Sequence, residues 1–202
     1  METKTIDDLL VEIREDKSQN FSTTSYKFKT DLWEFFQGFG NKNAVEYGTH
    51  KGQTTRILSH LFNQVITFNL PNHFEEAERL NSDRENITYI GVDLYASDPT
   101  EPIDGVPNIP VSVFFDDAVH SFDAVMHGFM RSTHMKLDSG DVYFVFDDYG
   151  MIREVFQAVN QLIFTKQLEL VKYIGHPPRH SFGGHPERVL FDHEGVIAKL
   201  LR

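Results

Sequence analysis

One short segment near residue 50 restricts the fold of this chain more than any other. Residues 44–47 are apolar apart from Glu46, and they lead into a turn that carries Gly48 and Gly52. A helical pattern then extends over residues 53–62. The order strand, glycine-rich turn, helix is typical of the first unit of a nucleotide-binding α/β sheet, where glycine lets the backbone approach a ligand closely. The segment therefore predicts a ligand site at the end of this strand.

The spacing of the glycines and the acid before them indicate the kind of ligand. The turn matches neither the GxGxxG pattern of dinucleotide sites nor the GxxxxGK[ST] pattern of phosphate-binding loops. Glu46 would also repel a phosphate group, whereas it can accept hydrogen bonds from an ammonium group or a hydroxyl. A neutral or cationic ligand is therefore favoured.

Short apolar runs alternate with helical patterns along the rest of the chain. The runs predict buried strands at residues 44–47, 65–68, 87–90, 111–115 and 142–146. Later strands are predicted at 168–174 and 188–191, with 196–198 as a candidate third. Apolar stripes predict helices that begin near Phe122 and Ile152. The alternation predicts the α/β class, as a parallel sheet with helices on both faces.

The whole chain, residues 1–202, is expected to form a single domain. No linker rich in proline or serine and no block of charge divides its 202 residues. Helical patterns in residues 6–13 and 32–36 predict an N-terminal helical cap over residues 1–40, which covers the ligand site or forms a homodimer contact, ahead of a core over residues 41–202. Residues 96–110 carry four prolines and predict a loop in place of a helix.

Composition limits the partners and the compartment. The formal net charge of -11 opposes a polyanion, so nucleic acid is disfavoured and a small-molecule substrate is preferred. The chain has no cysteine, hence no disulfide or thiolate metal site, and it has no apolar run of about 18 residues to span a membrane. Its polar, acidic N-terminus does not look like a signal peptide, which predicts a cytoplasmic protein.

Two later segments add to the first. Residues 113–123 read VFFDDAVHSFD, and residues 143–149 read YFVFDDY. Together with the ExGxxxG pattern of residues 46–52, they resemble class I S-adenosylmethionine-dependent methyltransferases, in particular the small metal-dependent O-methyltransferases. The resemblance covers roughly residues 40–175. It implies a doubly wound, mostly parallel, Rossmann-like sheet of seven strands with an antiparallel hairpin at its C-terminal edge and helices on both faces. It also implies S-adenosylmethionine as cofactor and methyl transfer to a small hydroxylated molecule.

The resemblance assigns cofactor contacts to the ends of the first three strands. They are Glu46, Gly48, Thr49 and Gly52 at the methionine part, Asn69 at the ribose and Asp93 at the adenine. The family usually carries Asp or Glu where this chain has Asn69, and one amide oxygen accepts fewer hydrogen bonds than a carboxylate does. The structural alternatives are an ordinary tight turn at the glycines and a solvated carboxylate at Asp93.

Acidic residues at the ends of the fourth and fifth strands predict a metal site. Asp117, Asp147 and Asp148 would repel one another without a compensating cation, and oxygen ligands favour magnesium, with manganese or calcium as alternatives. In the family that this chain resembles, such a metal binds the acceptor hydroxyl. The alternative is that Asp147 or Asp148 caps the following helix. His120 is a candidate general base or substrate contact, and a packed histidine is the alternative.

Two rival functions stay open. Asn69 and the proline-rich loop favour a methyltransferase-like domain that binds a ligand or partner without catalysis. The carboxylates with His120 would also suit a different metal-dependent enzyme on the same scaffold. A loop around residues 176–185, with Arg179 and His180, is expected on the substrate side.

Overall fold

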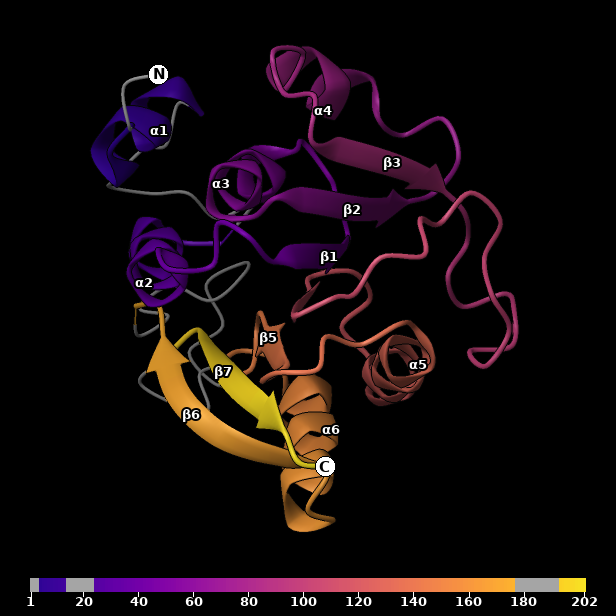
Figure 1. Ribbon diagram of the computed structural model, residues 1–202. Coiled ribbons are helices and arrows are strands. Elements are labelled where there is room, and N and C mark those ends of the chain that lie inside the picture. The colour runs from indigo at the N-terminus through magenta and orange to yellow at the C-terminus, as the bar shows by residue number, and fades with distance from the viewer. Residues whose placement is uncertain (1–3, 14–23, 177–192) are drawn as a thin grey trace.

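The computed structural model describes residues 4–13, 24–176 and 193–202, and its centre is one mixed β-sheet (Figure 1). The helices are α1 (Ile6–Glu12), α2 (Tyr26–Phe36), α3 (Gln53–Leu61), α4 (Glu75–Leu80), α5 (Phe122–His134) and α6 (Arg153–Phe164). The strands are β1 (Asn43–Tyr47), β2 (Gln64–Asn69), β3 (Ile87–Gly91), β4 (Val113–Asp116), β5 (Tyr143–Phe146), β6 (Leu168–Ile174) and β7 (Gly195–Leu200).

The seven strands lie in the order β3-β2-β1-β4-β5-β7-β6. The first five run parallel, because β1 pairs with β2 and β4, β2 pairs with β3, and β4 pairs with β5, each in parallel register. β7 is antiparallel to both of its neighbours, β5 and β6. The predicted α/β sheet, mostly parallel with an antiparallel pair at its C-terminal edge, is confirmed. The carboxyl ends of β1 to β5 therefore meet at one edge, where α/β proteins bind their ligands.

Helices cover both faces of the sheet, with α1, α2 and α3 on one side and α5 and α6 on the other (Figure 1). Neighbouring residues of β4 point to opposite faces. Phe115 packs edge-on against Phe28 of α2, with ring centres 5.9 Å apart, while Phe114 stacks on Phe144, which also contacts Phe129 of α5. This two-sided burial explains why the central strands read as continuous apolar runs.

Local capping fixes the N-terminal helices. Thr5 and Asp8 form a capping box at the start of α1, and the Ser25 hydroxyl accepts a hydrogen bond of 3.1 Å from the Phe28 N–H at the start of α2. The apolar sides of both helices are buried in the core beneath them, Leu9 and Leu10 among them. The division into a cap over residues 1–40 and a core over residues 41–202 stays a prediction.

Three features between and after the strands complete the comparison with the sequence. The loop predicted over residues 96–110 is confirmed, since no helix lies between β3 and β4. α4 was not predicted: Ala77 is its one buried residue, so it carries no apolar stripe. The strand predicted at 188–191 lies outside the described residues. Within the described ranges, none of the helices has both the length and the apolar character needed to cross a bilayer.

Candidate active site at the carboxyl edge of the sheet

A cavity of about 1110 Å³ opens at the carboxyl ends of the parallel strands. Its walls come from the turn after β1 and from the segments that follow β2, β3 and β4. Six of the predicted site residues line it: Gly48, Thr49, Asn69, Asp93, Asp117 and His120. The other predicted residues, Glu46, Gly52, Asp147 and Asp148, are not part of its lining.

The glycine-rich turn is held by contacts with the protein itself. Gly48 has a φ of 98°, and a Cβ there would overlap the Asp117 carbonyl oxygen. Gly52 has a φ of 76°, and a Cβ there would lie 2.7 Å from the Cβ of Ala77. Both positions therefore require glycine for backbone conformation and for packing. At both glycines the backbone lies close to another segment of the chain, and its close approach to a ligand stays a prediction.

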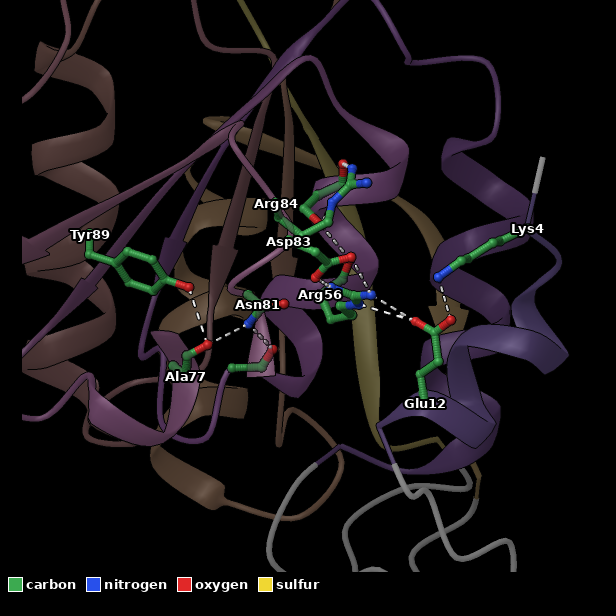
Figure 2. Close-up of polar contacts among 10 residues, drawn as sticks. Lys4, Glu12, Arg56, Ala77, Asn81, Asp83, Arg84 and Tyr89 are labelled. Atoms are coloured by element: carbon green, nitrogen blue, oxygen red, sulfur yellow. Dashed lines mark hydrogen bonds and ion pairs between the residues drawn. The ribbon is translucent and has the colours of Figure 1, made fainter. Parts of the chain in front are cut away.

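A polar network among α1, α3 and the segment after α4 stabilises this turn (Figure 2). The side-chain amide of Asn81 donates hydrogen bonds to the carbonyls of Gly52 (3.0 Å) and Ala77 (2.9 Å). Next to it, Arg56 of α3 forms ion pairs with Asp83 and with Glu12 of α1, the latter at 2.9 Å. The start of α3 is thereby tied to both α4 and α1.

Glu46 lies beneath the cavity. Its Oε2 accepts hydrogen bonds from the hydroxyls of Thr55 (2.5 Å) and Thr67 (2.6 Å), and Thr67 in turn lies 2.6 Å from the hydroxyl of Thr49 in the cavity wall. Its Oε1 is buried without a hydrogen-bond partner among the described residues. Burial raises the pKa of Glu46 to about 8. Hydrogen bonds through Thr67 and Thr49 thus connect the Glu46 carboxyl group to the cavity wall.

Asn69 and Asp93 line the cavity, and both already form hydrogen bonds within the chain. The Asn69 amide donates to the His73 carbonyl at 3.0 Å, and its oxygen accepts from the Leu70 N–H at 2.9 Å. Asp93 accepts from the Tyr95 N–H at 3.1 Å and is exposed. Each oxygen retains a lone pair for a ligand hydroxyl or amine.

At the other end of the cavity, acidic residues surround His120. Its Nε2 lies 3.4 Å from Asp117 Oδ1, and its Nδ1 lies 3.5 Å from Asp148 Oδ2. One ligand atom each from Asp117, His120 and Asp147 falls within 4.8 Å of the others, a grouping that would admit a metal ion. Of the three predicted metal ligands, Asp117 and Asp147 belong to this group. Asp148 contacts the group through His120.

Burial and mutual repulsion shift the protonation of this cluster. Burial, together with the charges of Asp148 and Asp117, raises the pKa of Asp147 well above its usual range, and burial raises the pKa of Asp148 to about 6. Burial lowers the pKa of His120, but its interactions with Asp117 and Asp148 outweigh that effect and the net shift is upward. Oδ1 of Asp147 is buried without a hydrogen-bond partner in the described part of the chain. A cation would satisfy these groups.

The predicted helix-capping role of Asp147 or Asp148 is wrong. α6 begins at Arg153, its N-cap is Ile152, and no side chain caps it. Asp148 instead adopts a left-handed φ of 54° in a turn whose N–H groups of residues 151 and 152 donate to its carbonyl. This tight turn separates β5 from the helix and keeps the two carboxylates at the end of the strand.

Glu194 is a buried acid beside the acidic cluster that sequence reasoning missed. It is 6% exposed, and its Oε1 accepts a hydrogen bond of 2.6 Å from the Ser25 N–H. Its backbone carbonyl accepts from the Gly150 N–H at 2.9 Å, which brings it next to the Asp147–Asp148 turn. Burial raises the pKa of Glu194 to about 7. The acid before an apolar strand was the available signal, but its neighbours come from distant parts of the chain. Arg179 and His180 lie outside the described residues.

Comparisons with solved structures agree with this architecture, although no protein-family model and no curated protein matches the sequence. An O-methyltransferase from Bacillus cereus, solved with S-adenosylhomocysteine (SAH), superposes with a TM-score of 0.65 at 12% identity, covering 98% of this chain and 90% of that one. TomG, an O-methyltransferase from Streptomyces achromogenes solved with S-adenosylmethionine, gives 0.62 at 12% identity over 100% and 92% of the two chains. The chain therefore has the Rossmann-like fold of S-adenosylmethionine-dependent methyltransferases.

The same fold also occurs in proteins that act on RNA. Fibrillarin from Methanococcus jannaschii, a pre-rRNA processing protein, gives a TM-score of 0.57 at 14% identity, covering 81% of this chain and 68% of its own. Fold alone does not determine the substrate.

Proposed function

We propose that this protein is a methyltransferase that uses S-adenosylmethionine to methylate a hydroxyl group of a small molecule with the help of a divalent metal ion. One observation carries the proposal. Asp117 and His120 belong both to the wall of the large cavity and to the group that would admit a metal. A methyl donor in the cavity and an activated hydroxyl at the cluster would then be neighbours.

The cavity suits the cofactor in size and in polar groups. Its volume of about 1110 Å³ exceeds what a single small ligand needs, which leaves room for an acceptor beside the donor. Bound S-adenosylmethionine supplies an electrophilic methyl group on a cationic sulfur. Asn69 would accept from a ribose hydroxyl, Asp93 from the adenine amine, and Thr49 would contact the methionine part. Glu46 would act on that part through Thr67 and Thr49, and Gly48 and Gly52 shape the turn.

The cluster suits a hard divalent ion such as magnesium or manganese. Asp117 and Asp147 would hold the ion, with His120 as a third ligand or as the base, and Asp148 would orient His120. A bound ion would lower the pKa of the acceptor hydroxyl. His120 Nε2, on the Asp117 side of the ring, would then take the hydroxyl proton. With S-adenosylmethionine bound, the methyl group would pass from its sulfur to the deprotonated oxygen, leaving S-adenosylhomocysteine as the product.

Calorimetric titration with Mg²⁺ and Mn²⁺, paired with an SAH-release assay on hydroxylated aromatic compounds, tests the metal's part. Asp147→Asn should weaken metal binding by more than about tenfold and abolish SAH release, because it removes a ligand from a buried site. Asp104→Asn, an exposed control in the 96–110 loop, should change neither. Unaltered metal binding in Asp147→Asn, or SAH release that a chelator leaves unchanged, would contradict the metal-assisted mechanism.

A non-catalytic ligand-binding role is the second candidate, and the state of Asn69 favours it. Both polar atoms of its amide already bond to the backbone nearby, at His73 and Leu70. A cofactor ribose would therefore be held more weakly than by a free carboxylate. Cofactor affinity distinguishes this role from catalysis. A different metal-dependent enzyme on this scaffold would turn over its substrate without S-adenosylmethionine.

The remaining parts of the proposal concern partners. The net charge of -11 supports a small-molecule substrate over nucleic acid. A cytoplasmic location is a separate part of the proposal. The apolar sides of α1 and α2, which suggested a homodimer contact in the sequence, are buried in the chain's own core. The sequence pattern therefore no longer supports a homodimer through these helices. The homodimer stays a prediction that light scattering can decide.

A further inference from the structure

A second cavity, of about 380 Å³, lies on the far side of Phe68 from the first. Phe68 lines both, so one residue of β2 forms their shared wall. The rest of the second cavity is built by the loop that replaces a helix after β3 and by the end of α5. Its volume falls within the range of small-molecule sites.

The lining of this second cavity combines an apolar body with cations. The apolar part consists of Phe68, Pro99, Pro102, Ile103, Val106, Pro107, Ile109 and Met135. Arg131, His134 and Lys136 contribute basic groups, whereas Glu101 is the sole acid in the lining. This local excess of positive charge stands out in a chain whose net charge is -11.

Arg131 is the main anchor of the cavity wall. It is 3% exposed and donates to the carbonyls of Glu101 (3.0 Å) and Asp98 (2.9 Å) and to the Ser97 hydroxyl (2.8 Å). Among the described residues it forms no ion pair, and its Nε has no acceptor. Its hydrogen-bond acceptors are neutral, and the Asp98 carboxylate interacts with it through charge alone. A buried guanidinium without a directly bonded carboxylate favours a further anion nearby.

Lys136 adds a second cation at the mouth. It is exposed and, within the described ranges, forms no ion pair. Its ammonium group is therefore available to a ligand, while prolines and branched aliphatic side chains offer the surface for an apolar body.

We propose that this second cavity binds a small amphiphile with an apolar body and one anionic group, such as a medium-chain carboxylate. The apolar wall would take the hydrocarbon part, and Arg131 and Lys136 would attract the carboxylate. The site is separate from the proposed methyl-transfer site and does not depend on it.

Calorimetric titration with octanoate, octanol and octylamine, in the absence of S-adenosylmethionine, tests the assignment. Octanoate should bind with a dissociation constant of about 1 mM or lower, and more tightly than octanol or octylamine. Val106→Trp and Ile103→Trp, which fill the cavity, should each abolish octanoate binding while thermal unfolding remains cooperative. Lys136→Gln should weaken octanoate binding about threefold, and Lys166→Gln, the same charge change beyond the end of α6, should leave it unaltered.

Three results would overturn the proposal. Equal binding of the three probes would mean a non-selective apolar crevice, and no octanoate binding would mean no such site. Octanoate binding that persists in both tryptophan variants would place the ligand elsewhere. S-adenosylhomocysteine binding, measured on the same samples, reports on the first cavity alone, so failure of one site is distinguishable from failure of the other.

Discussion

At the scale of single residues, Gly48 joins the turn after β1 to the segment after β4. Its φ of 98° and the Asp117 carbonyl oxygen at the place of a Cβ both exclude a side chain. Gly48→Ala should therefore lower the free energy of unfolding by more than about 3 kcal/mol. Gly40→Ala is the matched control, because a Cβ there meets nothing within 4 Å, and its effect should stay below about 1 kcal/mol. Urea unfolding measures both. Equal losses would contradict this packing argument.

Glu46 makes the stability of the ligand-free protein depend on pH. Its pKa rises from an ordinary 4.5 to about 8 on burial. Between these values the folded state binds more protons than the unfolded state, so the free energy of unfolding falls as pH increases. Glu46→Gln should remove this part of the slope between about pH 5 and pH 8. Urea unfolding at several pH values measures it, and a variant with the slope of the wild type would show that Glu46 is ionised in the fold.

The predictability of the site residues differs for physical reasons. Gly48, Asn69 and Asp117 follow strand ends, so a correct strand prediction places them at one edge of the sheet. The shielding of Glu46 by Thr67 depends on the pairing of β1 with β2, which no local pattern encodes. The placement of Glu194 beside the acidic cluster likewise depends on residues more than forty positions away, at Gly150 and Ser25.

At the scale of elements, α1 is attached to the rest of the molecule by a small polar network as well as by its apolar side. Glu12 pairs with Arg56 of α3 at 2.9 Å and with Lys4 (Figure 2). Glu12→Gln should cost about 1 kcal/mol, because its side chain is partly exposed. Hydrogen exchange should accelerate in α1 while α3 remains protected. Glu34→Gln, an exposed acid on α2, is the control. Identical exchange in both variants would mean that the apolar contacts alone hold α1.

Strands were easier to predict than the turns and short helices between them. The central strands are buried on both faces, which gives apolar runs that few other structures produce. α4 buries one alanine, so the sequence lacks the stripe that reveals an amphipathic helix. The Asp147–Asp148 turn looked like a helix start because it precedes α6, but the left-handed backbone at Asp148 delays the helix to Arg153.

At the scale of the whole molecule, strand order places the site and the chemistry remains a proposal. The parallel strands bring two groups of residues to the same edge of the sheet. The residues predicted to contact the cofactor follow β1, β2 and β3, and the acidic cluster follows β4 and β5. The alternation of strands and helices predicted the parallel sheet, and the family resemblance predicted its antiparallel edge. It was not sufficient to predict the second cavity, whose walls come from a loop and a helix end that are distant in sequence.

The central claim is that the large cavity binds S-adenosylmethionine, and binding of S-adenosylhomocysteine by calorimetry tests it most directly. Wild type should bind in the micromolar range, and Asn69→Ala should bind more weakly. Asn69→Asp should bind roughly fivefold more tightly, because a carboxylate accepts stronger hydrogen bonds from ribose hydroxyls. This order would support a cofactor site with a weakened ribose contact. No binding by any of the three proteins would contradict the account and leave a methyltransferase fold with another ligand.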